Sequence, residues 1–237
     1  MKRSFLVLGL FWGVLVLQPA VSRGQTLTPI GTWEVTIQGT DRGTSMMTFS
    51  NDMTVTGYGI TQKQFGLFSL MGNWGFNSQG DVVVAYVQTL DGTNTAVSFA
   101  AQLLRSGRFF AKGTGTSGRF RFKGAKPTDF SDLSGSWVAA VKRGTKTLHE
   151  TYTISVSSNF PAVFDVVGQG LSDTGSYALT GEIISASHSK LNASINRTAG
   201  LNTVRSSLWG MFKPRKPEMA LRGSDDTGAH LDVRAIQ

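Results

Sequence analysis

Polar and apolar residues alternate in short runs along most of the chain. The segments Trp33-Glu34-Val35-Thr36-Ile37 and Phe120-Arg121-Phe122-Lys123 change character at every position. A period of two places apolar side chains on one face of a β-strand and polar side chains on the other. Beyond the first 22 residues, no segment has the apolar spacing of an amphipathic helix. The pattern therefore predicts an all-β protein.

Turn-forming residues interrupt these runs at short intervals. In the first half of the chain, Gly, Asn, Asp and Ser gather at residues 40–43, 50–52, 77–80, 91–92, 106–107 and 117–118, and the polar stretch 61–64 is interpreted as a further turn. This spacing leaves room for about eight short strands, which protect their edges by closing into an up-and-down barrel or by stacking as a sandwich.

The opening strand occurs twice in the chain. Gly31-Thr32-Trp33 returns as Gly135-Ser136-Trp137, and Leu70-Met71-Gly72 returns as Leu179-Thr180-Gly181. Matching residues are 104 apart at the tryptophans (137 − 33) and 109 apart at the leucines (179 − 70), as expected if loops between strands differ in length. We predict two tandem antiparallel barrels of about eight strands each, at 23–126 and 127–237, which are free to pack against each other. The alternative is a single larger barrel or long sandwich that contains the strands of both repeats.

Three short motifs resemble a known family. Gly31-Thr32-Trp33 on the first strand, a Phe49-Ser50-Asn51-Asp52 turn and Gly72-Asn73-Trp74 are together similar to the small bacterial lipocalin-like (calycin-type) barrel domains. In that family, an arginine from the last strand packs on the tryptophan that closes one end of the barrel. The resemblance implies this role for Arg119 or Arg121 beside Trp33, and for Arg234 beside Trp137. It also implies a ligand-carrying or envelope-associated barrel and not an enzyme.

The N-terminal segment has the pattern of a secretory signal peptide. A basic start at residues 1–3 precedes an apolar stretch over residues 5–17 and the small residues 20–22. We therefore predict a signal peptide at 1–22 and an exported bacterial protein, periplasmic or secreted, with no transmembrane span in its mature form. The alternative, a membrane anchor, needs about 20 apolar residues. The chain has no cysteine, so an exported protein would depend on its cores and not on disulfides for stability.

The interior residues determine whether a barrel holds a ligand. About eight strands enclose a space that side chains fill or that accepts one small molecule. Large aromatic residues in the first repeat favour a solid core, whereas smaller residues such as Ala193 make the second repeat the better candidate for a cavity. The residues that we expect to line a ligand cavity are Trp33, Tyr58, Trp74, Phe99, Trp137 and Ile195.

Positive charge is concentrated near the middle of the chain. The formal net charge is +8, and no Asp or Glu occurs from Thr93 to Thr128. The residues predicted to form a basic surface are Arg105, Arg108, Lys112, Arg119, Arg121 and Lys123, with phenylalanines interleaved. Basic residues alternating with aromatic ones can bind single-stranded nucleic acid, but an exported protein would meet anionic lipids or glycans instead. A third interpretation is a soluble strand face that blocks edge pairing.

The sequence offers little for catalysis. His149, His188 and His230 are far apart, and none has a second ligand at metal-binding spacing. Neighbours on a strand, such as His149 and Glu150, point to opposite faces. We predict no catalytic residue, metal or cofactor, and no nucleic-acid partner. The chain is interpreted as a non-enzymatic binding protein for a small apolar or amphipathic ligand or for an anionic envelope surface, or else as a structural interaction module with solid cores.

Overall fold

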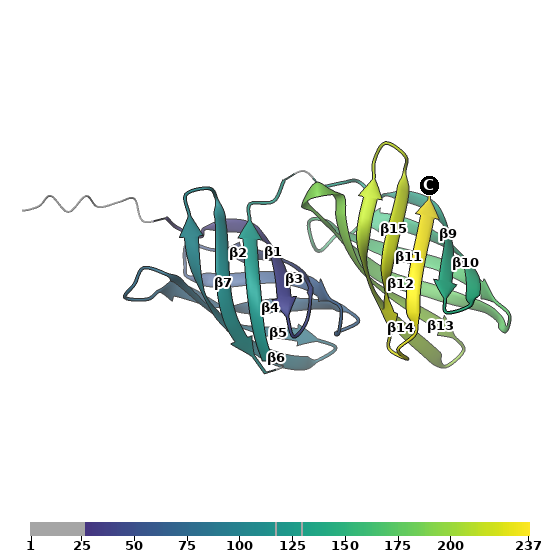
Figure 1. Ribbon diagram of the computed structural model, residues 1–237, viewed down its shortest axis with the longest axis horizontal. Helices are drawn as coiled ribbons and strands as arrows, with labels where there is room; N and C mark the ends of the chain where they lie inside the picture. Colours follow the sequence, from purple (N-terminus) through teal and green to yellow (C-terminus); the bar gives the residue numbers. More distant parts are fainter. Residues whose placement is uncertain (1–26, 117, 129) are drawn as a thin grey trace, which may run out of the picture.

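The computed structural model describes residues 27–116, 118–128 and 130–237, and the predicted signal peptide lies outside the described residues. Within these ranges the strands form two closed antiparallel barrels of eight strands each, one after the other in the chain (Figure 1). The prediction of two tandem up-and-down barrels is confirmed, and the alternative of a single shared barrel is wrong.

Each barrel is built from strands that pair with their neighbours in the sequence. The first contains β1 (Gly31–Gly39), β2 (Gly43–Phe49), β3 (Thr54–Thr61), β4 (Leu67–Phe76), β5 (Val82–Leu90), β6 (Thr93–Leu104), β7 (Arg108–Gly115) and β8 (Gly118–Ala125). The second contains β9 (Gly135–Arg143), β10 (Lys146–Val156), β11 (Val163–Ser172), β12 (Gly175–Ala186), β13 (Lys190–Ala199), β14 (Asn202–Lys213), β15 (Glu218–Asp225) and β16 (His230–Ile236). A 3-10 turn, η1 (Ser187–Ser189), connects β12 to β13. The barrels close because β8 pairs with β1 and β16 pairs with β9.

The strand registers show that the two barrels are copies of one arrangement. Trp33 faces Met47 across the β1–β2 pair, and Trp137 faces Tyr152 across the β9–β10 pair. Following the registers from strand to strand therefore gives each interior position of one barrel an equivalent in the other. This correspondence allows the two barrels to be compared residue by residue.

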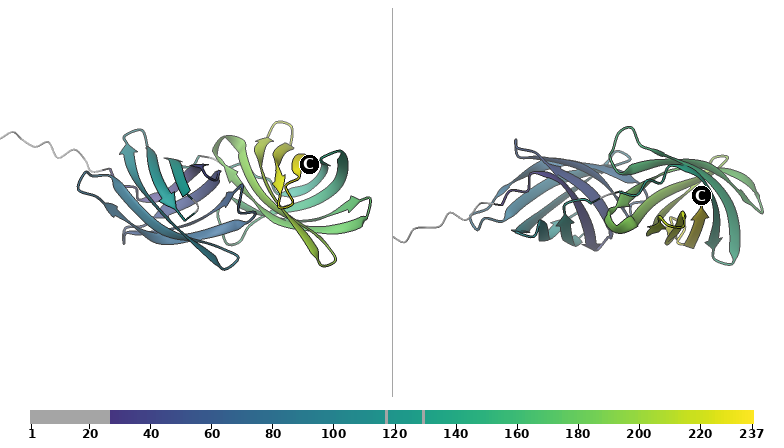
Figure 2. Two further views of the ribbon diagram at one scale, coloured as in Figure 1. Left: turned by 60° about the horizontal axis from the view of Figure 1, so that its bottom comes forward. Right: turned by 90° about the horizontal axis from the view of Figure 1, so that it is seen from above.

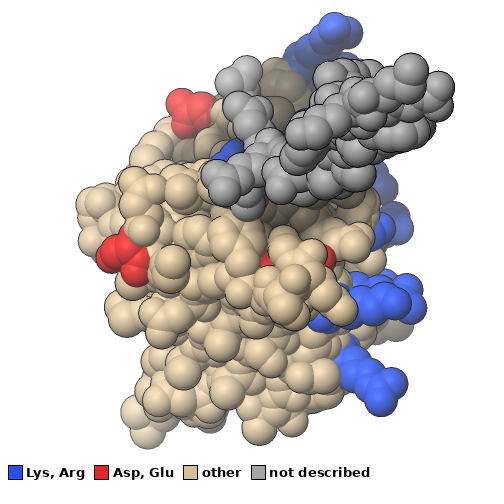
Figure 3. Space-filling model, turned by 90° about the vertical axis from the view of Figure 1, so that its left-hand side faces the viewer, with Lys and Arg blue, Asp and Glu red and all other residues tan. Residues whose placement is uncertain are grey.

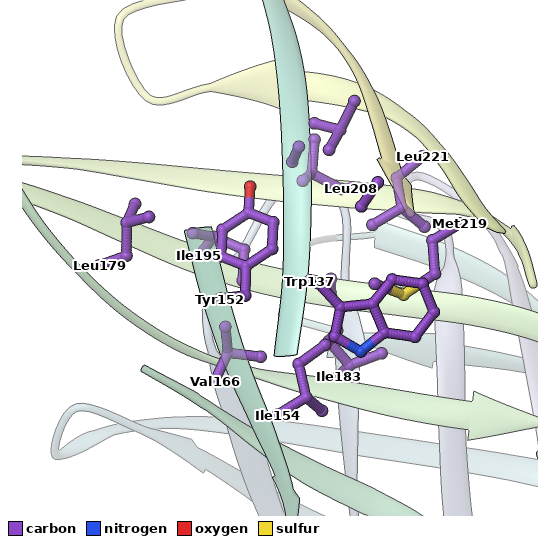
Figure 4. Packing of buried hydrophobic residues seen from close by; sticks show 14 of the residues in the cluster. Trp137, Tyr152, Ile154, Val166, Leu179, Ile183, Ile195, Leu208, Met219 and Leu221 are labelled. Atoms are coloured by element: carbon purple, nitrogen blue, oxygen red, sulfur yellow. The ribbon is translucent and has the colours of Figure 1, made fainter. Parts of the chain in front are cut away.

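Each barrel has its own apolar core, closed at one end by a tryptophan. Trp137 is 1% exposed, and its Nε1 donates a hydrogen bond of 2.9 Å to the Leu133 carbonyl; Figure 4 shows it beside Met219. Trp33 donates in the same way to the carbonyl of Pro29. In each barrel, the segment that leads into the first strand is thus hydrogen-bonded to the tryptophan at the base of the core.

The expected arginines do not pack on these tryptophans. Lys126 lies over Trp33, with Nζ 4.2 Å from the ring centroid, while Arg119 and Arg121 are exposed on the outer face. Residues alternate in direction along β8, so the same period that buries its phenylalanines turns its arginines outward. Arg234 is likewise exposed, and Phe212 packs edge-on against Trp137.

The two barrels are in direct contact, and both views in Figure 2 show them side by side. A small apolar cluster contains Ile60 of the first barrel with Val163 and Ile184 of the second. Hydrogen bonds surround it: Ser187 N donates to Glu34 Oε2 (2.7 Å), Asn192 Nδ2 to Thr44 Oγ1 (2.9 Å) and Ser207 Oγ to the Thr61 carbonyl (3.0 Å). These contacts are buried, so each barrel covers part of the other.

Candidate ligand site in the second barrel

The open end of the first barrel is filled by its own side chains. Tyr86, Phe120 and Phe122 fill it from the walls, and the Gln88 amide donates to Gln64 at the rim. The space left has a volume of only ≈ 20 Å³, which is room for about one water molecule. The first barrel therefore has a solid core, as its aromatic residues favour.

The open end of the second barrel contains a larger cavity of ≈ 320 Å³. This volume lies at the lower end of the range of about 300–1,000 Å³ that is typical of small-molecule sites. The cavity lies between strand ends of β9 to β14 and the β11–β12 turn. Its lining residues are Arg143, Lys146, Leu148, Ser172, Asp173, Thr174, Tyr177, Arg197, Ala199, Asn202 and Val204.

A buried layer of polar residues forms the floor of this cavity. Arg197 makes a two-point ion pair with Glu150, from Nε to Oε1 at 2.6 Å and from Nη2 to Oε2 at 3.1 Å. Its Nη1 donates to Ser206 Oγ at 2.6 Å. The hydroxyls of Tyr177 (2.8 Å) and Tyr152 also donate to the Glu150 carboxylate. Both oxygens of the buried Glu150 carboxylate therefore accept hydrogen bonds. A buried charged group without such partners would strongly destabilise the fold.

Two tyrosines and the arginine of this layer each keep one protonation state. Burial raises the pKa of Tyr152 and Tyr177, and the neighbouring Glu150 charge raises both further. The two phenols therefore stay protonated and donate. Burial alone would lower the pKa of Arg197, but the Glu150 carboxylate outweighs it, so the pKa of Arg197 is raised and the guanidinium stays charged.

A glycine on β11 makes room for the Tyr177 ring. A Cβ atom at Gly170 would lie 2.3 Å from Cζ of Tyr177 and 2.5 Å from its hydroxyl oxygen. In the first barrel, a Cβ at Gly59 would meet Phe68 Cζ at 2.3 Å in the same way. The absence of a side chain at Gly170 therefore lets the ring cross β11 and reach Glu150.

The first barrel shows that the fold closes without this ion pair. In the registers, the equivalents of Glu150 and Arg197 are Ser45 and Gln88. The full set Glu150, Tyr152, Tyr177, Arg197 and Ser206 corresponds to Ser45, Met47, Phe68, Gln88 and Val97. Burying two charges costs dehydration energy that a mostly apolar set avoids. The polar layer is thus a feature of the second barrel and not a requirement of the fold.

The cavity residues predicted from the sequence lie elsewhere. Trp33, Trp74 and Phe99 are buried in the first core, and Trp137 and Ile195 in the second. None of them lines the ≈ 320 Å³ cavity. Tyr58 lies between the barrels, where its hydroxyl donates to the Pro161 carbonyl and burial raises its pKa to about 12.

Sequence reasoning missed Glu150 and Arg197, although a signal was present. Along β10, the inward positions are Leu148, Glu150, Tyr152 and Ile154, so a charged residue interrupts an otherwise apolar face. The prediction that His149 and Glu150 point to opposite faces is confirmed, because His149 is exposed and Glu150 is buried. A charged residue on the apolar face of an alternating strand indicates a buried polar site.

The six predicted basic residues are exposed on the outside of the first barrel. Lys112, Arg119 and Arg121 line an open hollow of ≈ 900 Å³. Arg108 and Lys123 line a second hollow of ≈ 540 Å³, and Arg105, in the β6–β7 turn, lines neither. In Figure 3, Lys and Arg side chains gather along one side of this end of the molecule.

The described residues offer neither a cluster of metal ligands nor a membrane-spanning helix. Residues 27–116, 118–128 and 130–237 contain no group of three or more His, Cys, Asp or Glu side chains placed to hold a metal ion. In the same ranges no helix has the length and apolar character that crossing a membrane requires.

Some solved structures are similar to this chain at low sequence identity. No family model matches the chain, and no curated protein matches it. A redesigned β-barrel, mFAP1, solved bound to DFHBI, is 16% identical with a TM-score of 0.40, over 44% of this chain and 94% of that one. A protein of unknown function of the DUF3598 family from Nostoc punctiforme is 11% identical with a TM-score of 0.29, over 88% of this chain and 96% of that one. The two closed barrels fit a calycin-like fold, and membership of the lipocalin family stays a prediction.

Proposed function

We propose that this is an exported, non-enzymatic binding protein whose second barrel holds one small amphipathic molecule at its open end. The observation that carries the proposal is the difference between the two copies of the fold. The first barrel leaves ≈ 20 Å³ at its open end, whereas the second leaves ≈ 320 Å³ above a charged floor. The first barrel shows that side chains can fill this space. The second barrel leaves the same space open, which supports a ligand there.

The lining indicates the chemistry of the ligand. Leu148 and Val204 offer apolar wall, which suits a hydrocarbon or aromatic body. Arg197 carries five N–H donors, and the described residues accept three of them. Because Arg197 also lines the cavity, a carbonyl or carboxylate oxygen of the ligand would bind its remaining N–H groups. Two further cations line the cavity: Lys146, paired with Asp173 at 2.8 Å, and Arg143, paired with Asp225 at 2.7 Å.

A pair of tryptophan substitutions tests the site. Val204→Trp would fill the cavity, whereas Val167→Trp would place the same side chain on the outer face of β11, where Val167 is 60% exposed. The probe is 8-anilinonaphthalene-1-sulfonate, an anion with an apolar body. We expect wild type and Val167→Trp to bind one probe molecule per chain and Val204→Trp to bind at least about tenfold more weakly, a loss of about 1.4 kcal/mol.

Equal binding by all three proteins would contradict the proposal. Native mass spectrometry of the purified wild-type protein gives an independent measurement, since a retained small molecule would appear as added mass. We expect Val204→Trp to lose that mass and Val167→Trp to keep it.

A further inference from the structure

The outer face of the first barrel carries like charges directly opposite each other. Lys112 on β7 faces Arg121 on β8, and both side chains are exposed. Like charges opposite each other across strands destabilise a sheet. Within the described residues, neither side chain forms an ion pair.

The second barrel shows the ordinary arrangement at the same place. The registers make Arg222 and Asp232 the equivalents of Lys112 and Arg121, and these two form an ion pair at 3.9 Å. One copy of the fold thus has opposite charges where the other has two cations. The repulsion between two facing cations is therefore a property of the first barrel and not of the fold.

The positive charges follow one strand. Arg119, Arg121 and Lys123 alternate outward along β8, about 7 Å apart. The hollow around Arg119 and Arg121 also contains Arg42, and the hollow around Lys123 continues to Lys190 of the second barrel. The two hollows follow each other along β8. We use the name basic trough for the row formed by six of their cations, Arg42, Lys112, Arg119, Arg121, Lys123 and Lys190.

Protection of a sheet edge does not explain this trough. β8 pairs with β7 on one side and with β1 on the other, so the strand has no free edge. Solubility is normally obtained with interspersed charges of both signs. Of the acidic residues, only Glu34 lines either hollow, and its carboxylate accepts from Ser187 N.

The positions of the aromatic residues argue against nucleic acid. Phe109, Phe120 and Phe122 point into the core and are at most 8% exposed, so they offer no surface for bases to stack on. Phe110 is 49% exposed and lines the hollow around Lys123, so it is the single exposed phenylalanine of these four. The trough therefore offers a row of cations with one exposed phenylalanine beside it, and not a series of rings on which successive bases could stack.

We propose that the basic trough binds a linear acidic polysaccharide, whose carboxylate or sulfate groups repeat along an extended chain. Regularly spaced cations in an elongated trough match repeated anions on a chain better than they match a flat bilayer or a single small anion. This proposal is independent of the ligand at the second barrel.

The test uses a variant that copies the second barrel. Arg121→Asp places an acid opposite Lys112, as Asp232 lies opposite Arg222, so we expect its folding stability to be kept or increased. The matched control is Arg234→Asp, which changes the net charge equally on the exposed face of the second barrel. Binding of the full chain to heparin and to polygalacturonate is measured over a series of salt concentrations.

We expect Arg121→Asp to weaken binding to the polysaccharides about tenfold at low salt, and Arg234→Asp to weaken it less than twofold. Equal losses in the two variants would overturn the proposal, because net charge alone would then explain binding. Absence of polysaccharide binding by the wild type would also overturn it. So would tighter binding to single-stranded DNA or to phosphatidylglycerol vesicles than to either polysaccharide.

Discussion

Arg197 and Glu150 form a buried two-point ion pair inside the second barrel, at positions where the first barrel has Gln88 and Ser45. Because both barrels share one strand order and register, the first is an internal reference for the second. Differences between equivalent residues can therefore be separated from what the fold itself requires.

The first prediction concerns the polar layer. Arg197→Gln leaves the Glu150 carboxylate buried without its cation, and we expect the free energy of unfolding to fall by about 3–5 kcal/mol. The four-residue variant E150S/Y152M/Y177F/R197Q copies the first barrel and removes the buried charge entirely. Urea unfolding should show a smaller loss for the four-residue variant, and a larger one would contradict our account of the layer.

The second prediction concerns the glycine under Tyr177. Gly170→Ala forces the ring away from β11, and we expect a loss of about 1–3 kcal/mol in unfolding free energy together with weaker probe binding. Gly75→Ala is the control, because a Cβ atom there meets nothing within 4 Å. The control should change stability by less than about 0.5 kcal/mol. A Gly170→Ala protein as stable as the control would show that the ring position is not constrained.

The third prediction concerns the closed end of the second barrel. Trp137→Ala removes a side chain that is 1% exposed, and we expect it to cost about 3–5 kcal/mol. Trp209, on the outer face of β14, is 38% exposed, and its replacement by alanine should cost much less. Thermal unfolding of both variants compares the same substitution at a buried and at an outer position.

The fourth prediction concerns pH. Burial raises the pKa of Glu182 above its ordinary value of 4.5, and the neighbouring Asp165 and Asp91 raise it further. The folded state therefore holds this proton more tightly than the unfolded state, so ionisation of Glu182 lowers stability as pH rises through the raised pKa. At pH 7, we expect Glu182→Gln to melt at a higher temperature than wild type. At pH 4, we expect this gain in melting temperature to be smaller. A difference that does not change with pH would refute this assignment.

The fold could be predicted from the sequence because alternation and turn spacing are local signals. The repeated Gly-x-Trp motif then placed both barrels, and the registers confirm the match of Leu70 with Leu179. The basic face was predicted for the same reason, since outward positions on β7 and β8 follow from alternation. What alternation does not indicate is which inward residues meet across the barrel.

The ligand site depends on contacts between inward side chains of different strands. Glu150 and Arg197 are 47 residues apart, and they come together only after β10 to β13 have curved into a closed wall. Tyr58 shows the same limit, because its strand is covered on the outside by the second barrel. A single strand pattern cannot distinguish a side chain that faces its own core from one that faces a neighbouring domain.

The hydrogen bonds that Ser187 and Asn192 donate to Glu34 and Thr44 have a consequence for how the two proposed sites act together. They join the two barrels directly, so a polymer bound along the first barrel would also hold the second barrel close to it. The protein would then act as an adaptor, and the number of ligand molecules stored near a coated surface would follow the density of the polymer.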